Sequence, residues 1–64
     1  MKRTVYYSKK FPSISHPIYC ECRNSEGQVY YYDAFTSYKD MESFLHMLFK
    51  NDILQFISMD KKKK

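Results

Sequence analysis

The sequence predicts a small two-layer α+β domain in which one α-helix packs on an antiparallel β-sheet, with the elements in the order β-β-β-α-β. Three observations predict this fold: a hairpin pattern around the single glycine, an amphipathic helical period after Ser37, and a strand-forming run near the C-terminus. A chain of 64 residues has room for one domain. Because such a chain buries only ~60% of its unfolded surface, a homodimer would add stability.

The first strand is expected at Thr4 to Ser8, because this stretch is rich in β-branched and aromatic residues. A loop follows over residues 9–17, because Pro12 and Pro17 cannot donate to a strand ladder and serines surround them.

Two strand-like runs, Ile18 to Arg23 and Gln28 to Ala34, flank the four-residue turn 24–27 and predict a β-hairpin. If Arg23 faces Gln28, the ladder pairs Cys22 with Val29, Glu21 with Tyr30, Cys20 with Tyr31, and Tyr19 with Tyr32. Side chains then separate by the two-residue period of a strand. One face holds Ile18, Cys20, Cys22, Val29 and Tyr31, and the other holds Tyr19, Glu21, Arg23, Gln28, Tyr30 and Tyr32.

Ser37 is the expected N-cap of the helix, with Asp40 three residues later in a capping-box position. The apolar stripe of this helix follows the helical period and consists of Tyr38, Met41, Phe44, Leu45, Leu48 and Phe49. We expect the helix to end near Asn51. The run Ile53 to Met59 is predicted to form the last strand, with continuation of the helix as the alternative.

The net charge of +4 is concentrated at the two ends of the chain. Residues 11–60 carry three basic and seven acidic residues, a net charge of −4. We interpret residues 1–3 and 60–64 as basic flexible ends. The terminal lysines would contact phosphates or an acidic partner if they bind anything, and they are Lys61, Lys62, Lys63 and Lys64.

The chain shows neither a secretory signal pattern nor a run of about 18 apolar residues, so we expect a cytoplasmic protein with no membrane contact. Cys20 and Cys22 are interpreted as reduced, half-buried residues. A metal site built from these cysteines with His16 and His46 is the alternative, but a C-x-C spacing alone is a weak zinc signature. We therefore predict no metal and no cofactor.

No combination of nucleophile, base and paired carboxylates is evident, so the sequence predicts a non-catalytic protein. Its expected binding residues lie on the outer hairpin face, because tyrosine is enriched at protein interfaces. They are Tyr19, Glu21, Arg23, Tyr30 and Tyr32. The alternative is that Tyr6 or Tyr7 of the first strand, or a second copy of the chain, covers these rings. The first hypothesis is a binding module that captures another protein. The alternative is a nucleic-acid-binding protein in which tyrosines stack on bases and the basic ends hold phosphates. The acidic body of the chain weighs against this alternative.

The stretch from the hairpin turn onward carries Gly27-x-x-Tyr30-Tyr31, then Ser37-x-x-Asp40-Met41-Glu42, and a closing Ile53-Leu54-Gln55-Phe56. This arrangement resembles the small dimeric phage inhibitors of uracil-DNA glycosylase over residues 18–59. The resemblance implies a dimer with an acidic, DNA-imitating surface, and the basic ends depart from that pattern. A short chain with a complete fold and no active site suits a viral or mobile-element inhibitor of a host protein, located in the host cytoplasm.

Overall fold

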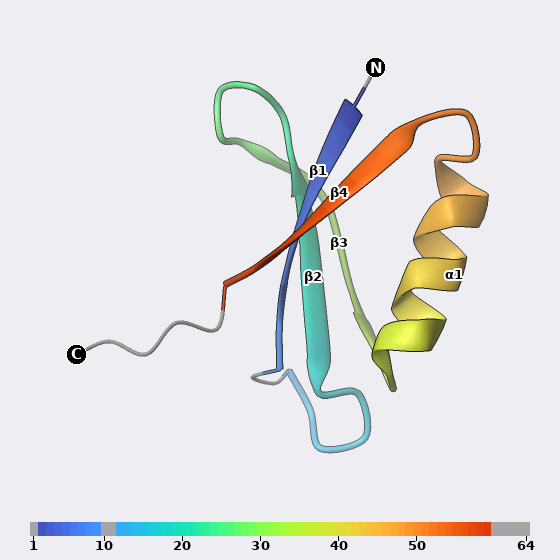
Figure 1. Cartoon of the computed structure of the whole chain (residues 1–64). Coiled ribbons are helices and arrows are strands. Elements are labelled where there is room, and N and C mark those ends of the chain that lie inside the picture. The colour runs from blue at the N-terminus through green and yellow to red at the C-terminus, as the bar shows by residue number, and fades with distance from the viewer. Residues whose placement is uncertain (1, 10–11, 60–64) are drawn as a thin grey trace.

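The computed structural model describes residues 2–9 and 12–59 of the chain. It contains four strands and one helix in the predicted order (Figure 1). The elements are β1 (Lys2–Ser8), β2 (Ile18–Arg23), β3 (Val29–Phe35), α1 (Tyr38–Leu48) and β4 (Ile53–Ser58). The α+β class and the β-β-β-α-β order are confirmed.

The four strands form one sheet in the order β3-β2-β1-β4. The β1–β2 and β2–β3 pairs are antiparallel, but β4 runs parallel to β1, so the sheet is mixed and not fully antiparallel as expected. The reason is the connection through α1. The helix carries the chain back to the end of the sheet where β3 began, so β4 starts beside the start of β1 and must run in the same direction.

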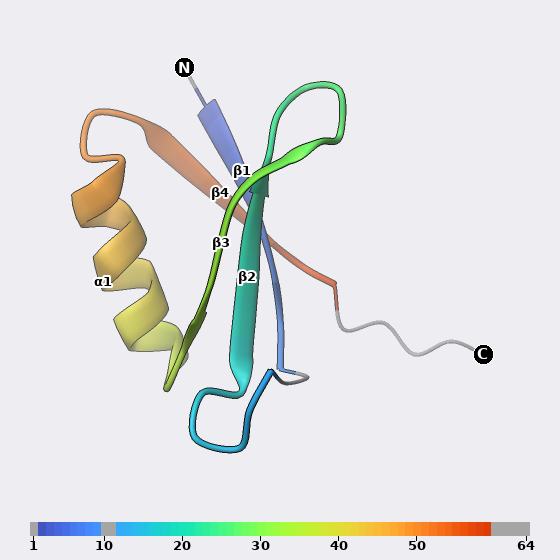
Figure 2. The same cartoon turned by 180° about the vertical axis from the view of Figure 1, so that it is seen from behind.

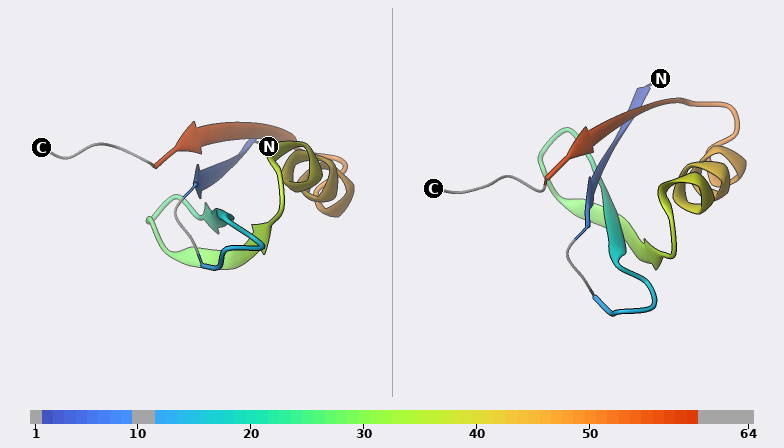
Figure 3. Two further views of the ribbon diagram at one scale, coloured as in Figure 1. Left: turned by 90° about the horizontal axis from the view of Figure 1, so that it is seen from below. Right: turned by 60° about the horizontal axis from the view of Figure 1, so that its bottom comes forward.

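The sheet is strongly twisted, and Figure 1 shows β4 crossing in front of β2 at a marked angle. Viewed from behind in Figure 2, β3 lies at the front and β4 recedes. The end-on view of Figure 3 places α1 on one side of the sheet. On the other side, no helix or strand of the described residues covers it.

The hairpin register differs from the expected one. Arg23 pairs with Val29, and after a β-bulge Cys22 pairs with Tyr31 and Glu21 with Tyr32. Tyr30 is the extra residue of the bulge, which the expectation of uniform pairing did not allow for. Beyond the bulge, each residue of β2 pairs with a residue of β3 two positions later than expected. Because this shift is an even number of residues, Tyr31 still faces the core and Tyr32 still faces outward.

The turn before this bulge is built by Asn24 and Gly27. The Asn24 side-chain carboxamide accepts hydrogen bonds from the backbone N–H of Glu26 at 2.9 Å and of Gln28 at 3.0 Å. Gly27 has a φ of 83°, a conformation that L side chains rarely adopt. The single glycine of the chain therefore occupies the one described position with a positive φ.

The helix begins as predicted, because the Ser37 hydroxyl accepts a hydrogen bond from the Asp40 backbone N–H at 3.2 Å. Asp40 itself accepts from the Thr36 hydroxyl at 2.6 Å. The last helical residue is Leu48 and the C-cap is Phe49, so the helix ends earlier than expected. Phe49 is thereby free of the helical period and turns toward the sheet, where its ring meets that of Tyr31 edge-on at 6.3 Å.

The core lies between α1 and the sheet. Its buried apolar residues come from the helix and from β1 and β2, and they are Val5, Ile18, Cys20, Cys22, Met41 and Leu45. Partly buried aromatic and aliphatic residues surround this cluster, including Tyr7, Tyr31, Phe35, Phe44, Leu54 and Phe56. The strand predicted for the final run is confirmed and ends at Ser58, which excludes the helical alternative.

The N-terminal strand is longer than predicted. Lys2 and Arg3, which we assigned to a flexible basic end, form the first two residues of β1 and pair with Ile53 and Leu54 of β4. The C-terminal part of that expectation, residues 60–64 with the four terminal lysines, lies outside the described residues. No helix in the described part of the chain is long and apolar enough to cross a membrane.

Candidate functional site

The sheet surface turned away from α1 carries a row of side chains that crosses three strands. Tyr6 of β1 pairs with Glu21 of β2, and Glu21 pairs with Tyr32 of β3, so all three point to the same side. Tyr19 and Arg23 flank Glu21 on its own strand with the same orientation. We call this surface the open face and define it by Tyr6, Tyr19, Glu21, Arg23 and Tyr32.

Glu21 is the centre of the open face and is only 7% exposed. Its carboxylate accepts a hydrogen bond from the Tyr19 hydroxyl at 3.1 Å and from Arg23 Nε at 2.8 Å, with a further ion-pair contact from Arg23 Nη2. A buried charge is tolerated when it is paired and hydrogen-bonded. Glu21 therefore acts as an internal anchor that fixes both neighbouring side chains, and its charge is neutralised by Arg23.

Arg23 is held on a second side by an aromatic ring. Its guanidinium carbon lies 4.6 Å from the centroid of the Tyr6 ring, within the range of a cation–π contact. Its Nη1 makes no hydrogen bond within the described residues. Arg23 is thus preorganised by Glu21 and Tyr6 while one terminal nitrogen still points to solvent.

The remaining tyrosines provide the exposed aromatic area. Tyr32 is 66% exposed, and its ring centroid lies 6.5 Å from that of Tyr19. Burial, followed by the hydrogen bond to Glu21, raises the pKa of Tyr19 above its ordinary value of 10.0. Tyr19 is therefore a neutral hydrogen-bond donor at physiological pH.

Tyr30 does not join the open face, although the sequence placed it there. The bulge turns its side chain toward β1, where its hydroxyl accepts a hydrogen bond from Arg3 Nη1 at 2.9 Å. Arg3 also pairs with Asp52 and lies 4.5 Å from the Phe49 ring centroid. Tyr30 and Arg3 therefore tie the hairpin to the turn between α1 and β4. Gln28, also expected on the outer face, lies in the turn and hydrogen-bonds with Asn24.

Tyr6 takes part in the open face in place of Tyr30, and the sequence reasoning did not assign it to the binding surface. A usable signal was present, because Val5 is the most apolar residue of the first strand. If Val5 faces the core, the two-residue period places Tyr6 on the opposite side. The alternative in which Tyr6 or Tyr7 covers the other tyrosines is not observed, because Tyr6 lies on the same face as they do and the Tyr7 ring centroid lies 5.3 Å from that of Tyr38 in the helix.

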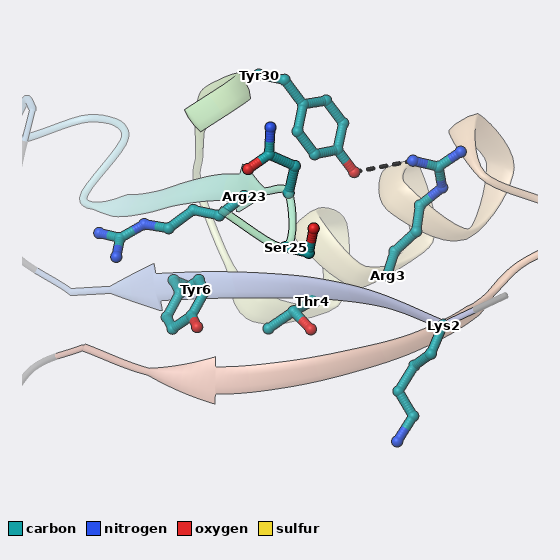
Figure 4. Close-up of a pocket in the computed structure, with 8 residues that line it drawn as sticks. Lys2, Arg3, Thr4, Tyr6, Arg23, Ser25 and Tyr30 are labelled. Carbon is teal, nitrogen blue, oxygen red and sulfur yellow. Dashed lines mark hydrogen bonds between the residues drawn. The ribbon is translucent and has the colours of Figure 1, made fainter. Parts of the chain in front are cut away.

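A hollow of about 780 Å³ adjoins the open face at the end near the hairpin turn. It is lined by the start of β1 and by the hairpin, through Lys2, Arg3, Thr4, Tyr6, Arg23, Asn24, Ser25 and Tyr30. Figure 4 shows Thr4 and Ser25 near the middle of this lining, with Arg3 and Arg23 extending to opposite sides. Tyr6 and Arg23 belong both to this hollow and to the open face.

The candidate metal ligands of the sequence lie in different surroundings. Both cysteines are free and lie completely buried in the core, not half-buried as expected. Burial raises the pKa of Cys20 to about 12. The His16 ring hydrogen-bonds to Ser15, and His46 lies on the helix near Phe56. No group of three or more His, Cys, Asp or Glu side chains in residues 2–9 and 12–59 is placed to hold a metal ion.

The observed site is thus a tyrosine-rich open face around the Glu21–Arg23 pair, with a donor-lined hollow at one end. No family model, curated protein or solved structure matches this chain.

Proposed function

We propose that this chain is a non-catalytic binding domain that captures another protein through its open face. One observation carries the proposal: Tyr6, Tyr19 and Tyr32 share with a fixed Arg23 one sheet face that no other described helix or strand covers. Tyrosine and arginine are the residue types most enriched at the energetic centres of protein interfaces.

The arrangement of the open face favours binding because its polar groups are already paired. Glu21 is neutralised by Arg23 and hydrogen-bonded to Tyr19 before any partner arrives. A partner that covers these residues therefore leaves no unpaired charge at the centre of the interface. Holding Arg23 between Glu21 and the Tyr6 ring also lowers the entropy lost on binding.

A capture experiment tests this proposal. The full chain and its Tyr19→Ala/Tyr32→Ala variant are immobilised and exposed to lysate of the cells in which the protein acts, and bound proteins are identified by mass spectrometry. We expect the variant to lose a protein that the original chain retains. Circular dichroism checks that both chains are folded.

Met47→Ala is the matched control, because Met47 is 67% exposed on the helix, in the other layer of the molecule. Loss of one exposed apolar side chain there should leave capture unchanged. Equal capture by the tyrosine variant, or equal loss in the control, would show that the open face is not the binding surface.

A more specific form of this proposal is that binding inhibits the activity of the captured protein. The chain would act as an inhibitor of a host enzyme in the host cytoplasm, and a viral origin would suit that role. Uracil-DNA glycosylase is the first enzyme to test, because the sequence resembles inhibitors of that enzyme. Release of uracil from DNA should fall on addition of the original chain and recover with the tyrosine variant. Unchanged release would remove this enzyme as the target.

Nucleic-acid binding is the second candidate function, and the hollow favours it. Three cationic side chains line the hollow, and Glu21, the acid within the aromatic surface, is neutralised by Arg23. However, the Arg23 guanidinium already covers the Tyr6 ring on which a base would stack. A labelled oligonucleotide titrated at low salt decides between the two, because phosphate contacts are strongest there. Salt-dependent binding lost in Tyr32→Ala would support this function, and no binding would exclude it.

A further inference from the structure

We infer that the hollow beside the open face binds an anionic group, a carboxylate or a phosphate, carried by the protein that the open face captures. This inference rests on the proposed function and names the chemistry of the partner. It is carried by the lining of the hollow, by the way the two arginines are held, and by the residues that the hollow shares with the open face.

The lining of the hollow is rich in hydrogen-bond donors. It contains two guanidinium groups, one ammonium group, four hydroxyl groups and one carboxamide, and no carboxylate. An oxygen-rich anion is the ligand that such a set satisfies, because each cation and each hydroxyl can donate to it. The volume of about 780 Å³ exceeds what one carboxylate or phosphate fills, so the group it carries must occupy the rest.

Both arginines are fixed and each retains a donor. Arg3 uses Nε for Asp52 and Nη1 for Tyr30, which leaves Nη2 without a hydrogen bond within the described residues. Arg23 uses Nε and Nη2 for Glu21, which leaves Nη1. The carboxylates that hold them lie outside the lining. Each guanidinium group is therefore held in place by its partners and keeps one nitrogen that can donate to a bound anion.

The Tyr30 hydroxyl adds a directed donor. Because its oxygen accepts the hydrogen bond from Arg3, its own proton is available to a ligand. The displacement of Tyr30 by the bulge, which removes it from the open face, thus places it in the lining of the hollow.

Lys2 supplies a positive charge that no described carboxylate neutralises. Arg3 and Arg23 each have a carboxylate partner, whereas Lys2 has no ion pair within the described residues. Figure 4 shows the Lys2 side chain pointing away from the two arginines. An exposed lysine changes rotamer within nanoseconds, so its ammonium group can close on an anion after entry.

The residues that the hollow shares with the open face indicate that the anion belongs to a protein partner. Tyr6 and Arg23 line the hollow and also form part of the open face, so a molecule that lies across the open face reaches the hollow without a gap. An acidic or phosphorylated side chain at the rim of that partner would enter it. Charge complementarity at an interface rim sets partner choice and association rate.

Heteronuclear NMR of the full chain tests the inference directly. A short polyglutamate peptide and inorganic phosphate are titrated separately at low salt, and backbone amide shifts are followed residue by residue. We expect saturable shifts at Thr4, Asn24, Ser25 and Tyr30 with one or both probes. The two titrations also show whether a carboxylate or a phosphate is preferred. Shifts confined to residues 61–64 would overturn the inference, because the anion would then bind only the terminal lysines.

The Lys2→Gln variant sharpens the test, with Lys39→Gln as its matched control on an exposed helix position. Loss of the unmatched charge should weaken probe binding about fivefold, whereas the control should change it little. Equal effects of the two variants would mean that only the overall charge matters, and this would contradict a site at the hollow.

A short oligothymidine serves as the third probe. Tighter binding of the oligonucleotide than of polyglutamate at the same amides would overturn the assignment to a protein partner in favour of a nucleic acid. Failure of the inference is distinguishable from failure of the proposed function. Lys2→Gln leaving partner capture intact while Tyr19→Ala/Tyr32→Ala abolishes it would refute the anion site alone.

Discussion

The two faces of the sheet are built from different chemistry. The face under α1 is apolar, and Val5, Cys20, Cys22, Met41 and Leu45 are completely buried there. The open face is aromatic and charged, and its one buried residue with a formal charge, Glu21, has its partners in place. The first face supplies the hydrophobic burial that drives folding. The second adds little apolar burial and instead presents an ordered surface.

The residues that stabilise the fold and the residues that we propose to bind a partner are thus separated by the thickness of one sheet. Side chains alternate along each strand, so Cys20 and Cys22 enter the core while Tyr19, Glu21 and Arg23 lie on the open face. Substitutions on the covered face should therefore unfold the chain, and substitutions on the open face should leave it folded.

Leu45→Ala should have the largest effect, because Leu45 is completely buried against the sheet. Removing a core leucine side chain costs about 2–5 kcal/mol of the free energy of unfolding, since a cavity remains. A small domain has little more stability than this. Urea unfolding followed by circular dichroism should show a large fall in the midpoint. A midpoint within the error of the original chain would show that the helix does not form the core.

Alkaline pH should weaken the covered face next. Burial raises the pKa of Cys20 from 9.0 to about 12, and burial with the nearby Asp33 raises that of Tyr31 from 10.0 to about 12. Folding thus favours the protonated forms, so stability is full below about pH 9 and falls as the unfolded chain loses protons. Each group that is protonated in the folded chain and deprotonated in the unfolded chain lowers the free energy of unfolding by about 1.4 kcal/mol per pH unit.

The urea midpoint measured at increasing pH checks this prediction. Cys20→Ala serves as the comparison, because it removes one of the titrating groups and should decline less steeply above about pH 9. Parallel declines in the two chains would rule out Cys20 as a source of the pH dependence.

Glu21→Gln should destabilise the open face moderately. The substitution keeps the shape of the side chain but removes the charge that pairs with Arg23, whose side chain remains about one-third exposed. Charged hydrogen bonds contribute about 1.5–3 kcal/mol when buried, and solvent screening reduces this to about 1–2 kcal/mol here. High salt should narrow the difference between the two chains in a urea titration. A difference that is insensitive to salt would argue that packing, not charge, holds Arg23.

Tyr32→Ala should have the smallest effect on stability, within about 0.5 kcal/mol, because most of the ring is exposed. The same variant should lose most of its affinity for a captured partner. Parallel measurement of unfolding and of partner binding gives the cleanest separation of the two faces. A large loss of stability with unchanged binding would reverse the roles assigned to them.

Local signals in the sequence predicted most of the elements. Ser37 capped the helix where expected, and the apolar period correctly identified Met41 and Leu45 as core residues. The alternation in β2 correctly placed Cys20 and Cys22 inside and Tyr19, Glu21 and Arg23 outside. These features depend on side-chain period and capping, which act over a few residues.

Features that depend on contacts between distant segments were not predicted. The parallel pairing of β4 follows from where α1 returns the chain, and the Arg3–Asp52 pair joins residues 49 positions apart. The bulge at Tyr30 changes the strand register, although no glycine or proline at that position indicates a bulge. The alternation around Val5 indicates the face on which Tyr6 lies, but its place beside Glu21 follows from the β1–β2 pairing, which local sequence does not determine.

Whether the open face is the binding surface can be measured by NMR, by mapping a captured partner onto the isotope-labelled full chain. We expect the amide signals of the open face to shift or broaden on binding, while those of the exposed helix residues Lys39, Glu42 and Met47 stay unchanged. Changes confined to the helix, with the open face unaffected, would show that the partner binds elsewhere.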